Sequence, residues 1–387
     1  MSTPVKREAG TPLSDAATSP KHTAPGPSSP GPASPKSKSP TPAPGSPAPE
    51  VSGVLSGAHW LQQGLPEVDE DELDSTLGSD VESSTASISS SILNYRTLNG
   101  RTYHSDSVTD GEYWGPNDQK HLNALEIYAH GLFLMLGEKL HQAPLKDDIK
   151  QAIDIGTGPG YWAIDFADKY TNCEVIGTDI SPVQPTWCPA NLSFQIDDAT
   201  KEWTFPDNRF DYIHIQFMNG AVEDWTELYK QAYRCCKPGG WIEHIDVSPN
   251  ILSDDGTVTV GSAMDQYGKV LSEAGIKINR RTTTSQDGVQ ESGIKEAGFI
   301  NMTVKDYKMP VSGWPEDPKL RQVGHCAFAA ISEDLEGVIQ FHFGHVMGWS
   351  QEEITTFAAH LRQEMKGMKM HGYWPWKCVY AQKPLDA

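Results

Sequence analysis

The segment IDIGTGPGYWAI, residues 153–164, constrains the fold of this chain more than any other. An apolar strand pattern leads into a glycine-rich turn, and a helical pattern begins directly after it. A strand, turn and helix of this kind expose backbone amides at a helix N-terminus, so the segment predicts that the backbone approaches a small ligand closely. The residues that we expect to form this contact are Asp154, Gly156, Thr157, Gly158 and Gly160.

The spacing of the glycines separates two kinds of ligand. A dinucleotide fingerprint is G-x-G-x-x-G, and Tyr161 stands here where its third glycine belongs. The pattern D/E-x-G-x-G-x-G beginning at Asp154 instead resembles that of class I S-adenosylmethionine (AdoMet) methyltransferases. The resemblance implies AdoMet as cofactor, with Asp154 supporting the loop or balancing the ammonium group, and disfavours an NAD-dependent oxidoreductase. Taken alone, the loop also fits an ordinary strand-to-helix turn.

Further strand patterns follow at the spacing of βαβ units, and two of them end in acids. Residues 174–181 end near Asp179, which lies 25 residues after Asp154. An acid after the second strand accepts ribose hydroxyls in nucleotide-binding folds, so we assign the ribose to Asp179 and its neighbour Ile180. Residues 192–199, 210–217 and 237–246 continue the series.

The third strand pattern ends in two adjacent acids, Asp197 and Asp198. We assign the adenine to Asp198 together with the amide of Ala199, because this acid directly precedes the alanine. Asp197 is expected to be solvated or to cap a turn. The acids at successive strand ends make an AdoMet site a coherent interpretation of the whole segment.

The first 92 residues differ in composition from the rest of the chain. Thirteen of the 28 prolines precede Glu50, and an acidic run at 68–74 and a serine tract at 83–91 follow. Such a segment buries too little apolar surface to offset its ordering entropy, so we expect residues 1–92 to be disordered. No apolar stretch follows the start, so no secretory signal peptide is expected.

The remaining residues, 93–387, are expected to form one domain with three parts. These are an N-terminal lid and helix at 93–145, a cofactor-binding core at 146–250 and a substrate-side part at 251–387. Of the formal net charge of −20, residues 1–49 carry +3 and residues 50–93 carry −9, which leaves −14 for the folded part. This charge argues against direct nucleic-acid binding, which needs a basic face.

Other features exclude further classes of protein. The six cysteines form no C-x-x-C, so we expect a reduced protein of the nucleus or cytoplasm. His342 and His345, with His325 and Cys326 upstream, fit no strong zinc spacing, and no metal is expected. No apolar stretch reaches about 18 residues, so no transmembrane segment is expected.

Hydrophobic periodicity predicts the remaining elements. The aromatic, turn-rich residues 99–118 suggest a lid or entry segment, and residues 121–140 form a helix that covers the pocket or packs on the sheet. Ser350 and Glu353 form a capping box before a helix. The other expected elements are helices at 260–274 and 287–297 and strands at 299–307 and 372–384.

Several longer segments resemble one family, the fungal LaeA-like methyltransferases. The elements that carry the resemblance are SPVQP, W-x-PAN and IDDA within residues 175–205, with NGRTYH and GPND upstream and GWSQEEI and HGYWPWKCVY downstream. The resemblance covers about residues 95–385. It implies an α/β class I methyltransferase sheet of seven strands in the order 3-2-1-4-5-7-6, with helices on both faces and a disordered N-terminal arm.

The family resemblance also implies a role and partners. Its members regulate secondary metabolism and development, some associate with velvet-type proteins, and their methyl acceptors are poorly defined. An active methyltransferase acting on a protein or small metabolite is one hypothesis. A cofactor-binding scaffold with weak turnover is the other, and eight Ser/Thr-Pro sites before Glu50 suit regulation by phosphorylation.

Residues near the methyl acceptor are harder to assign. Methyl transfer from a sulfonium depends mainly on alignment, and a general base is needed only if the acceptor must lose a proton first. Gln216 lies where the methyl group should point, and His214 alternates with it along the strand, where a packed histidine is the alternative. The remaining candidates are Tyr103 and His104 in the lid and Glu243, His244 and Asp246 after the fifth strand. The tryptophans at 162, 203 and 241 are expected to pack.

Overall fold

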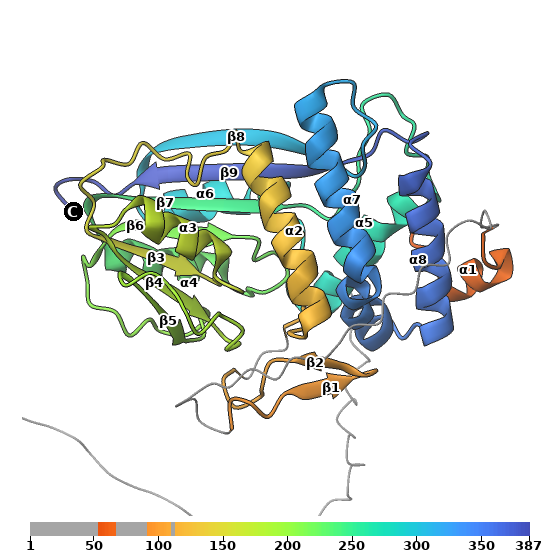
Figure 1. Ribbon diagram of the computed structural model, residues 1–387, viewed down its shortest axis with the longest axis horizontal. Coiled ribbons are helices and arrows are strands. Elements are labelled where there is room, and N and C mark those ends of the chain that lie inside the picture. Colours follow the sequence, from red (N-terminus) through yellow and green to blue (C-terminus); the bar gives the residue numbers. More distant parts are fainter. Residues whose placement is uncertain (1–52, 67–90, 110–112) are drawn as a thin grey trace, which may run out of the picture. The chain divides into compact units, whose positions relative to one another are not determined.

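A computed structural model describes residues 53–66, 91–109 and 113–387, and a seven-stranded sheet lies at their centre (Figure 1). The spatial order is β5-β4-β3-β6-β7-β9-β8. Strands β5 to β7 are parallel, and β9 runs antiparallel to both β7 and β8. Counted along the chain, this is the order 3-2-1-4-5-7-6, which confirms the predicted class I methyltransferase topology. The strands are β3 (Gln151–Ile155), β4 (Glu174–Asp179), β5 (Leu192–Ile196), β6 (Phe210–Gln216), β7 (Cys236–Val247), β8 (Ile300–Pro310) and β9 (Tyr373–Gln382).

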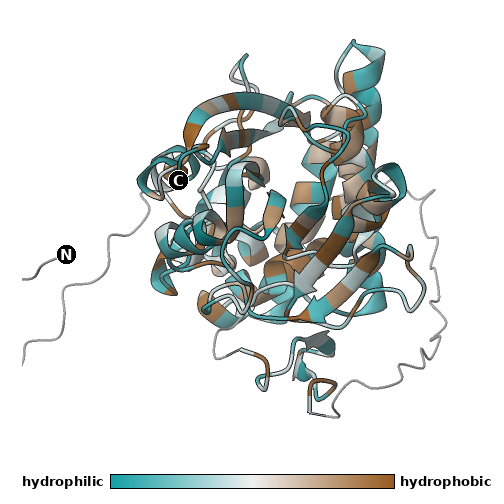
Figure 2. Cartoon of the chain, turned by 90° about the vertical axis from the view of Figure 1, so that its left-hand side faces the viewer, coloured by the Kyte–Doolittle hydropathy of each residue, from teal (hydrophilic) through white to brown (hydrophobic). Residues whose placement is uncertain are grey.

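Helices cover both faces of the sheet, as predicted. Ile153 and Ile213 belong to a core shared with α4 (Trp225–Cys235) and α6 (Val289–Glu296). Their neighbours in the strands, Ala152 and Tyr212, point to the opposite face and pack with α3 (Tyr161–Lys169). Because successive strand residues face opposite sides, a parallel strand covered by helices is apolar along its whole length. Figure 2 shows hydrophobic colouring on strands in the interior and on the helices that pack around them.

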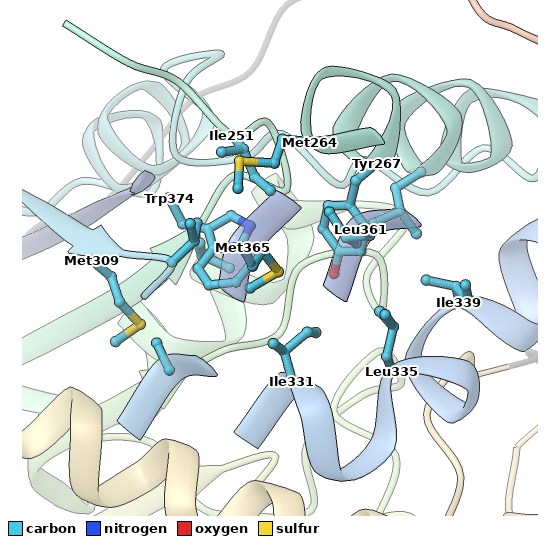
Figure 3. Packing of buried hydrophobic residues seen from close by; sticks show 14 of the residues in the cluster. Ile251, Met264, Tyr267, Met309, Ile331, Leu335, Ile339, Leu361, Met365 and Trp374 are labelled. Carbon is cyan, nitrogen blue, oxygen red and sulfur yellow. The ribbon is translucent and has the colours of Figure 1, made fainter. Parts of the chain in front are cut away.

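A layer of helices lies at the carboxyl ends of the parallel strands (Figure 1). It consists of α2 (Gln119–Met135), α5 (Ala263–Lys277), α7 (Pro318–Ile339), the π-helix η1 (Gln340–Val346) and α8 (Gln351–Lys366). Buried side chains such as Met264, Leu335 and Leu361 join α5, α7 and α8 into one core (Figure 3). The predicted capping box is confirmed, since the Ser350 and Glu353 side chains each bond the other's backbone amide. The long helix α7 was not predicted.

The prediction of disorder for residues 1–92 is wrong for residues 53–66. Helix α1 (Gly57–Gln63) packs on α8, and Trp60 is only 2% exposed. Its ring lies 5.0 Å from that of Phe357, centroid to centroid, in an edge-to-face contact. This apolar segment therefore offsets its ordering entropy by burial, which the proline-rich composition around it obscured. The rest of the predicted arm, 1–52 and 67–90, lies outside the described residues.

The expected lid segment begins with a small hairpin of β1 (Arg96–Leu98) and β2 (Arg101–Tyr103). Arg101 anchors it, because its guanidinium donates to both oxygens of Asp118 and of Asp334 at 2.6–2.8 Å. His121 Nδ1 also lies 3.0 Å from Asp334 Oδ2. The hairpin, α2 and α7 are thus tied together at one buried carboxylate.

Two boundaries along this region differ from expectation. The helix expected at 121–140 spans 119–135, because the chain turns through Gly137, which has a φ of 74°. The helix expected at 260–274 begins at Ala263, where Ser262 caps it by accepting from the amide of Asp265. Among the described helices, none has the length and apolar character needed to cross a membrane.

Candidate functional site

A cavity of about 410 Å³ opens at the carboxyl ends of β3, β4, β5 and β6. The glycine loop forms one wall and α2 forms another, so the predicted helix does cover the pocket. Residues 113 and 115–117 of the expected lid segment also line it. Every predicted cofactor residue except Gly160 lines the cavity, namely Asp154, Gly156, Thr157, Gly158, Asp179, Ile180, Asp198 and Ala199.

Two glycines of the loop are required by the backbone and its neighbours. Gly156 has a φ of 69°, and a Cβ there would lie 2.7 Å from Met218 Sδ. Gly160 has a φ of 84° and caps α3 with the Phe194 ring packed against it, so a side chain has no room. Gly160 therefore shapes the start of the helix, and its neighbours in the loop meet the cavity.

Asp154 supports the loop through a chain of buried side chains. Its Oδ2 accepts from Thr157 Oγ1 at 2.6 Å, and its Oδ1 lies 2.8 Å from His214 Nδ1. The Trp162 indole stacks on the His214 ring at 3.7 Å between centroids, with 8° between the ring planes. His214 is fully buried in the wall of the cavity, where it is one of the lining residues and orients Asp154. Its other ring nitrogen, Nε2, has no hydrogen-bond partner among the described residues. The predicted packing role of Trp162 agrees with this arrangement.

Asp179 links the second strand to the loop. Its two oxygens accept from the amides of Gly158 at 2.8 Å and Ser181 at 2.9 Å. Burial raises the pKa of Asp179 to about 6, against the lowering effect of these two hydrogen bonds. The carboxylate is therefore mainly ionised at neutral pH and retains lone pairs that can accept two ribose hydroxyls.

The adjacent acids after β5 differ in environment. Asp198 Oδ1 accepts from the amide and the hydroxyl of Thr200 at 2.9 and 2.7 Å. Burial raises its pKa, but hydrogen bonds from Thr109 and Thr200 outweigh this and hold the pKa below its usual range. Burial raises the pKa of Asp197, which also lines the cavity. The Trp203 indole donates to the carbonyl of Ala199 at 3.0 Å and fixes the turn beside Asp198.

Gln216 ends β6 and lines the cavity, and its place near the methyl group stays a prediction. Sequence reasoning did not single out Phe217, Tyr113 and Arg280, which also line the cavity. Phe217 has a φ of 55°, a left-handed conformation that is rare for phenylalanine and that the local sequence does not predict. Arg280 comes from the segment after α5 and donates to the carbonyl of Ala221.

The two candidates in the hairpin do not reach the cavity. Tyr103 is 2% exposed and His104 is 1% exposed, and neither lines the cavity. Burial raises the pKa of Tyr103 to about 12. The structure therefore does not support a catalytic role for these residues, because their side chains are buried in and beside the hairpin rather than in the cavity wall.

The candidates after the fifth strand are held inside the protein. Glu243 accepts from the amides of Gln142 and Ala143 at 2.8 and 2.6 Å, which fixes the segment after α2. His244 lies 2.7 Å from the Tyr229 hydroxyl and 3.1 Å from Asp246 Oδ2. All three are fully buried and none lines the cavity, so their hydrogen bonds are structural. The described residues contain no cluster of three or more His, Cys, Asp or Glu side chains that could hold a metal.

The strand order and the acid-lined cavity behind a glycine loop define a class I methyltransferase, whose cofactor is AdoMet. The family described as "Methyltransferase domain" matches residues 128–277. With "Methyltransferase pytC" of Aspergillus terreus the chain is 35% identical over 79% of its own length and 93% of that protein. The chain belongs to the LaeA-like methyltransferases of fungi, which confirms the resemblance seen in the sequence.

Two other relatives carry more specific names. "Secondary metabolism regulator LAE1" of Cochliobolus heterostrophus is 32% identical over 71% of this chain and 90% of that protein. "Protein-methionine methyltransferase laeA" of Emericella nidulans is 30% identical over 74% and 76%. These names describe the relatives: the first states a regulatory role, and the second states methyl transfer to protein methionine.

Proposed function

We propose that this methyltransferase is catalytically active and regulates secondary metabolism or development, with a protein or small metabolite as acceptor. The observation that carries the proposal is the cavity in which the glycine loop, Asp179 and Asp198 come together. Relatives that are named as regulators and as methyltransferases support both halves of the proposal. Velvet-type proteins as partners, and the nucleus or cytoplasm as location, belong to the same proposal.

Different residues of the cavity bind different parts of the cofactor. The loop amides and Asp154 face the amino-acid end of AdoMet, Asp179 holds the ribose, and Asp198 with Ala199 meets the adenine. When bound, the cofactor supplies an electrophilic methyl group on a good leaving group. The chain then has to align the acceptor with this group, which can provide much of the acceleration.

A cofactor-binding scaffold is the second candidate, and one observation favours it. His214 and Glu243, the titratable groups near the ends of β6 and β7, are fully buried in hydrogen bonds or stacked rings. Glu243 does not line the cavity, and His214, which does, is held between Asp154 and the stacked Trp162 ring, so acceptors that must first lose a proton gain little from them. The eight Ser/Thr-Pro sites, which suit a regulatory subunit, lie outside the described residues.

Titration of AdoMet into the full chain by calorimetry tests the proposal. We expect the wild type to bind, and Asp179→Ala to bind about 10–100-fold more weakly, because charge-assisted hydrogen bonds to the ribose are lost. Asp168→Ala, an exposed acid of α3, is the matched control and should bind like the wild type. Absence of binding by the wild type would contradict the proposal. Binding without labelled methyl transfer to any component of a cell extract would favour the scaffold.

A further inference from the structure

A second, smaller cavity of about 90 Å³ lies beside the cofactor cavity. The two share four lining residues, His121, Leu125, Tyr128 and Phe217. The rings of Tyr128 and Phe217 stand 5.1 Å apart, centroid to centroid, in this common wall. The second cavity therefore begins directly beyond Gln216, the residue at the end of β6 toward which the methyl group should point.

The wall of the second cavity carries no charged side chain among its lining residues, apart from the titratable His121 and His342. Aromatic and aliphatic groups from the helical layer form most of it, including Tyr267 of α5, Ile331 of α7 and Trp374 of β9 (Figure 3). A charged ligand would lose its hydration here without gaining a counter-ion from these walls. The cavity thus favours a neutral, largely apolar group.

Three lining residues nevertheless carry buried polar atoms without a hydrogen-bond partner in the described part of the chain. They are both ring nitrogens of His342, the hydroxyl of Thr282 and Oδ1 of Asn219. The residues are 2%, 5% and 8% exposed, respectively. Leaving a buried polar group unpaired costs free energy, so three of them around one cavity indicate that a ligand pairs with them.

The backbone places His342 at this position in an unusual way. It lies in the π-helix η1, and single π-helical turns are uncommon and occur frequently at functional sites. Burial lowers the pKa of His342 to about 3, so its imidazole is neutral at physiological pH. A neutral imidazole offers one donor and one acceptor, which suits a hydroxyl or carbonyl group on a ligand.

We propose that the second cavity binds the methyl acceptor, and that this acceptor is a neutral, largely apolar small molecule bearing a hydroxyl or carbonyl group. This proposal rests on the proposed function. The apolar part of the acceptor lies among the aromatic walls, its polar group pairs with His342 and Thr282, and its remainder reaches past Phe217 into the cofactor cavity. The selectivity for the acceptor then comes from residues of α5, α7 and η1 rather than from the sheet.

The test uses probes matched in size and different in charge. Benzyl alcohol, benzoate and benzylamine are titrated into the full chain by ligand-observed NMR, with S-adenosylhomocysteine saturating the first cavity. We expect benzyl alcohol to bind at least about tenfold more tightly than the two ions, since each ion loses hydration without compensation. Equal binding of all three probes, or no binding of benzyl alcohol, would overturn the proposal.

Two variants and a control separate the second cavity from the rest of the protein. His342→Phe and Thr282→Val should each weaken benzyl alcohol binding about fivefold, through the loss of one hydrogen bond. His345→Phe, in the same π-helix but outside the cavity lining, should leave binding unchanged. If His342→Phe does not fold, Thr282→Val decides the matter.

Cofactor binding is followed in parallel so that the two proposals can fail separately. All three variants should bind S-adenosylhomocysteine like the wild type in calorimetry. If the wild type does not bind it, the proposed function fails whatever the probes do. If cofactor binding is intact but His342→Phe behaves like His345→Phe, or labelled methyl transfer to a protein proceeds unchanged in His342→Phe, the acceptor proposal fails alone.

Discussion

At the scale of single residues, the site depends on acids whose environments make them different. Asp179 ends β4, Asp198 follows β5 by two residues, and both line the cavity. Burial dominates at Asp179 and raises its pKa to about 6, whereas hydrogen bonds prevail at Asp198 and hold its pKa low. Of these two acids, therefore, only Asp179 changes its charge near pH 6.

The pKa of Asp179 gives a prediction for cofactor binding. In the proposed function its carboxylate accepts ribose hydroxyls when ionised, so AdoMet affinity should fall as the pH drops through 6. With a pKa of about 6, roughly one tenth of the groups are ionised at pH 5, and we expect about tenfold weaker binding there than at pH 8. Calorimetric titrations at the two values check this. An affinity independent of pH would show that the ribose is held elsewhere.

The raised pKa of Asp179 affects the stability of the cofactor-free protein in the opposite direction, because this stability falls as the pH rises. Because the pKa of Asp179 is raised on folding, its contribution is fully present below the pKa of the unfolded chain and is lost as the pH rises through about 6. Ionised Asp179 is thus a cost to the empty site at neutral pH. Hydrogen bonds from the bound cofactor would offset this destabilisation of the empty site.

At the scale of elements, the hairpin is joined to α2 and α7 by one ionic cluster. Arg101 bonds both Asp118 and Asp334, and Asp334 is fully buried. Burial raises the pKa of Asp334, but His121 and Arg101 hold it below its usual range. A carboxylate with a lowered pKa stabilises the fold above its unfolded pKa and loses that contribution as the pH falls.

Removal of the cation in this cluster should be costly. We expect Arg101→Met to lower the free energy of unfolding by about 3–5 kcal/mol at pH 7, because Asp334 is left charged and buried. The loss should shrink as the pH falls toward 3 and Asp334 becomes protonated. Urea unfolding followed by circular dichroism measures both. Arg281→Met, which breaks a more exposed ion pair with Asp287, should cost at most about 1 kcal/mol, and an equal loss in both variants would contradict the prediction.

The helices and strands were predicted from the sequence with unequal success. The strands of the parallel sheet were predicted to within a few residues, because alternation and apolar runs are local signals. Helix α7 and the π-helix η1 were missed, and both hold residues of the second cavity. Tyr103 and His104 were expected at the pocket but lie inside the hairpin packing, since a turn pattern does not say which way a hairpin faces.

At the scale of the whole molecule, a segment from the N-terminal region joins the C-terminal layer. The compact unit that holds the described residues includes α1, whose Trp60 packs on α8. Gln266 of α5 donates to the carbonyl of Gly53 and accepts from the amide of Leu55. The contacts described for this region therefore begin at Gly53, far upstream of the expected domain start at residue 93.

Two truncations should separate the parts of this region. Deletion of residues 1–52 should leave the melting temperature unchanged, whereas deletion of residues 1–66 should lower it by several degrees, because burial of Trp60 and the bonds of Gln266 are lost. Trp60→Ala should by itself lower the free energy of unfolding by about 3–5 kcal/mol. Trp187→Ala is the control, since that side chain is 75% exposed. Equal melting temperatures for the two truncations would contradict the prediction.

The sequence alone determined the cofactor half of this protein. The glycine loop and the acids at 154, 179 and 198 follow from short patterns, because the residues expected to bind AdoMet lie at or just after the carboxyl ends of the strands that carry them. The strand order was implied by the family resemblance. Only the tertiary structure decided which polar residues face a cavity, as His214 does, and which are enclosed, as Glu243 and His244 are. The second cavity draws on α2, α5, α7 and η1, segments far apart along the chain, so packing rather than any local pattern brings its residues together.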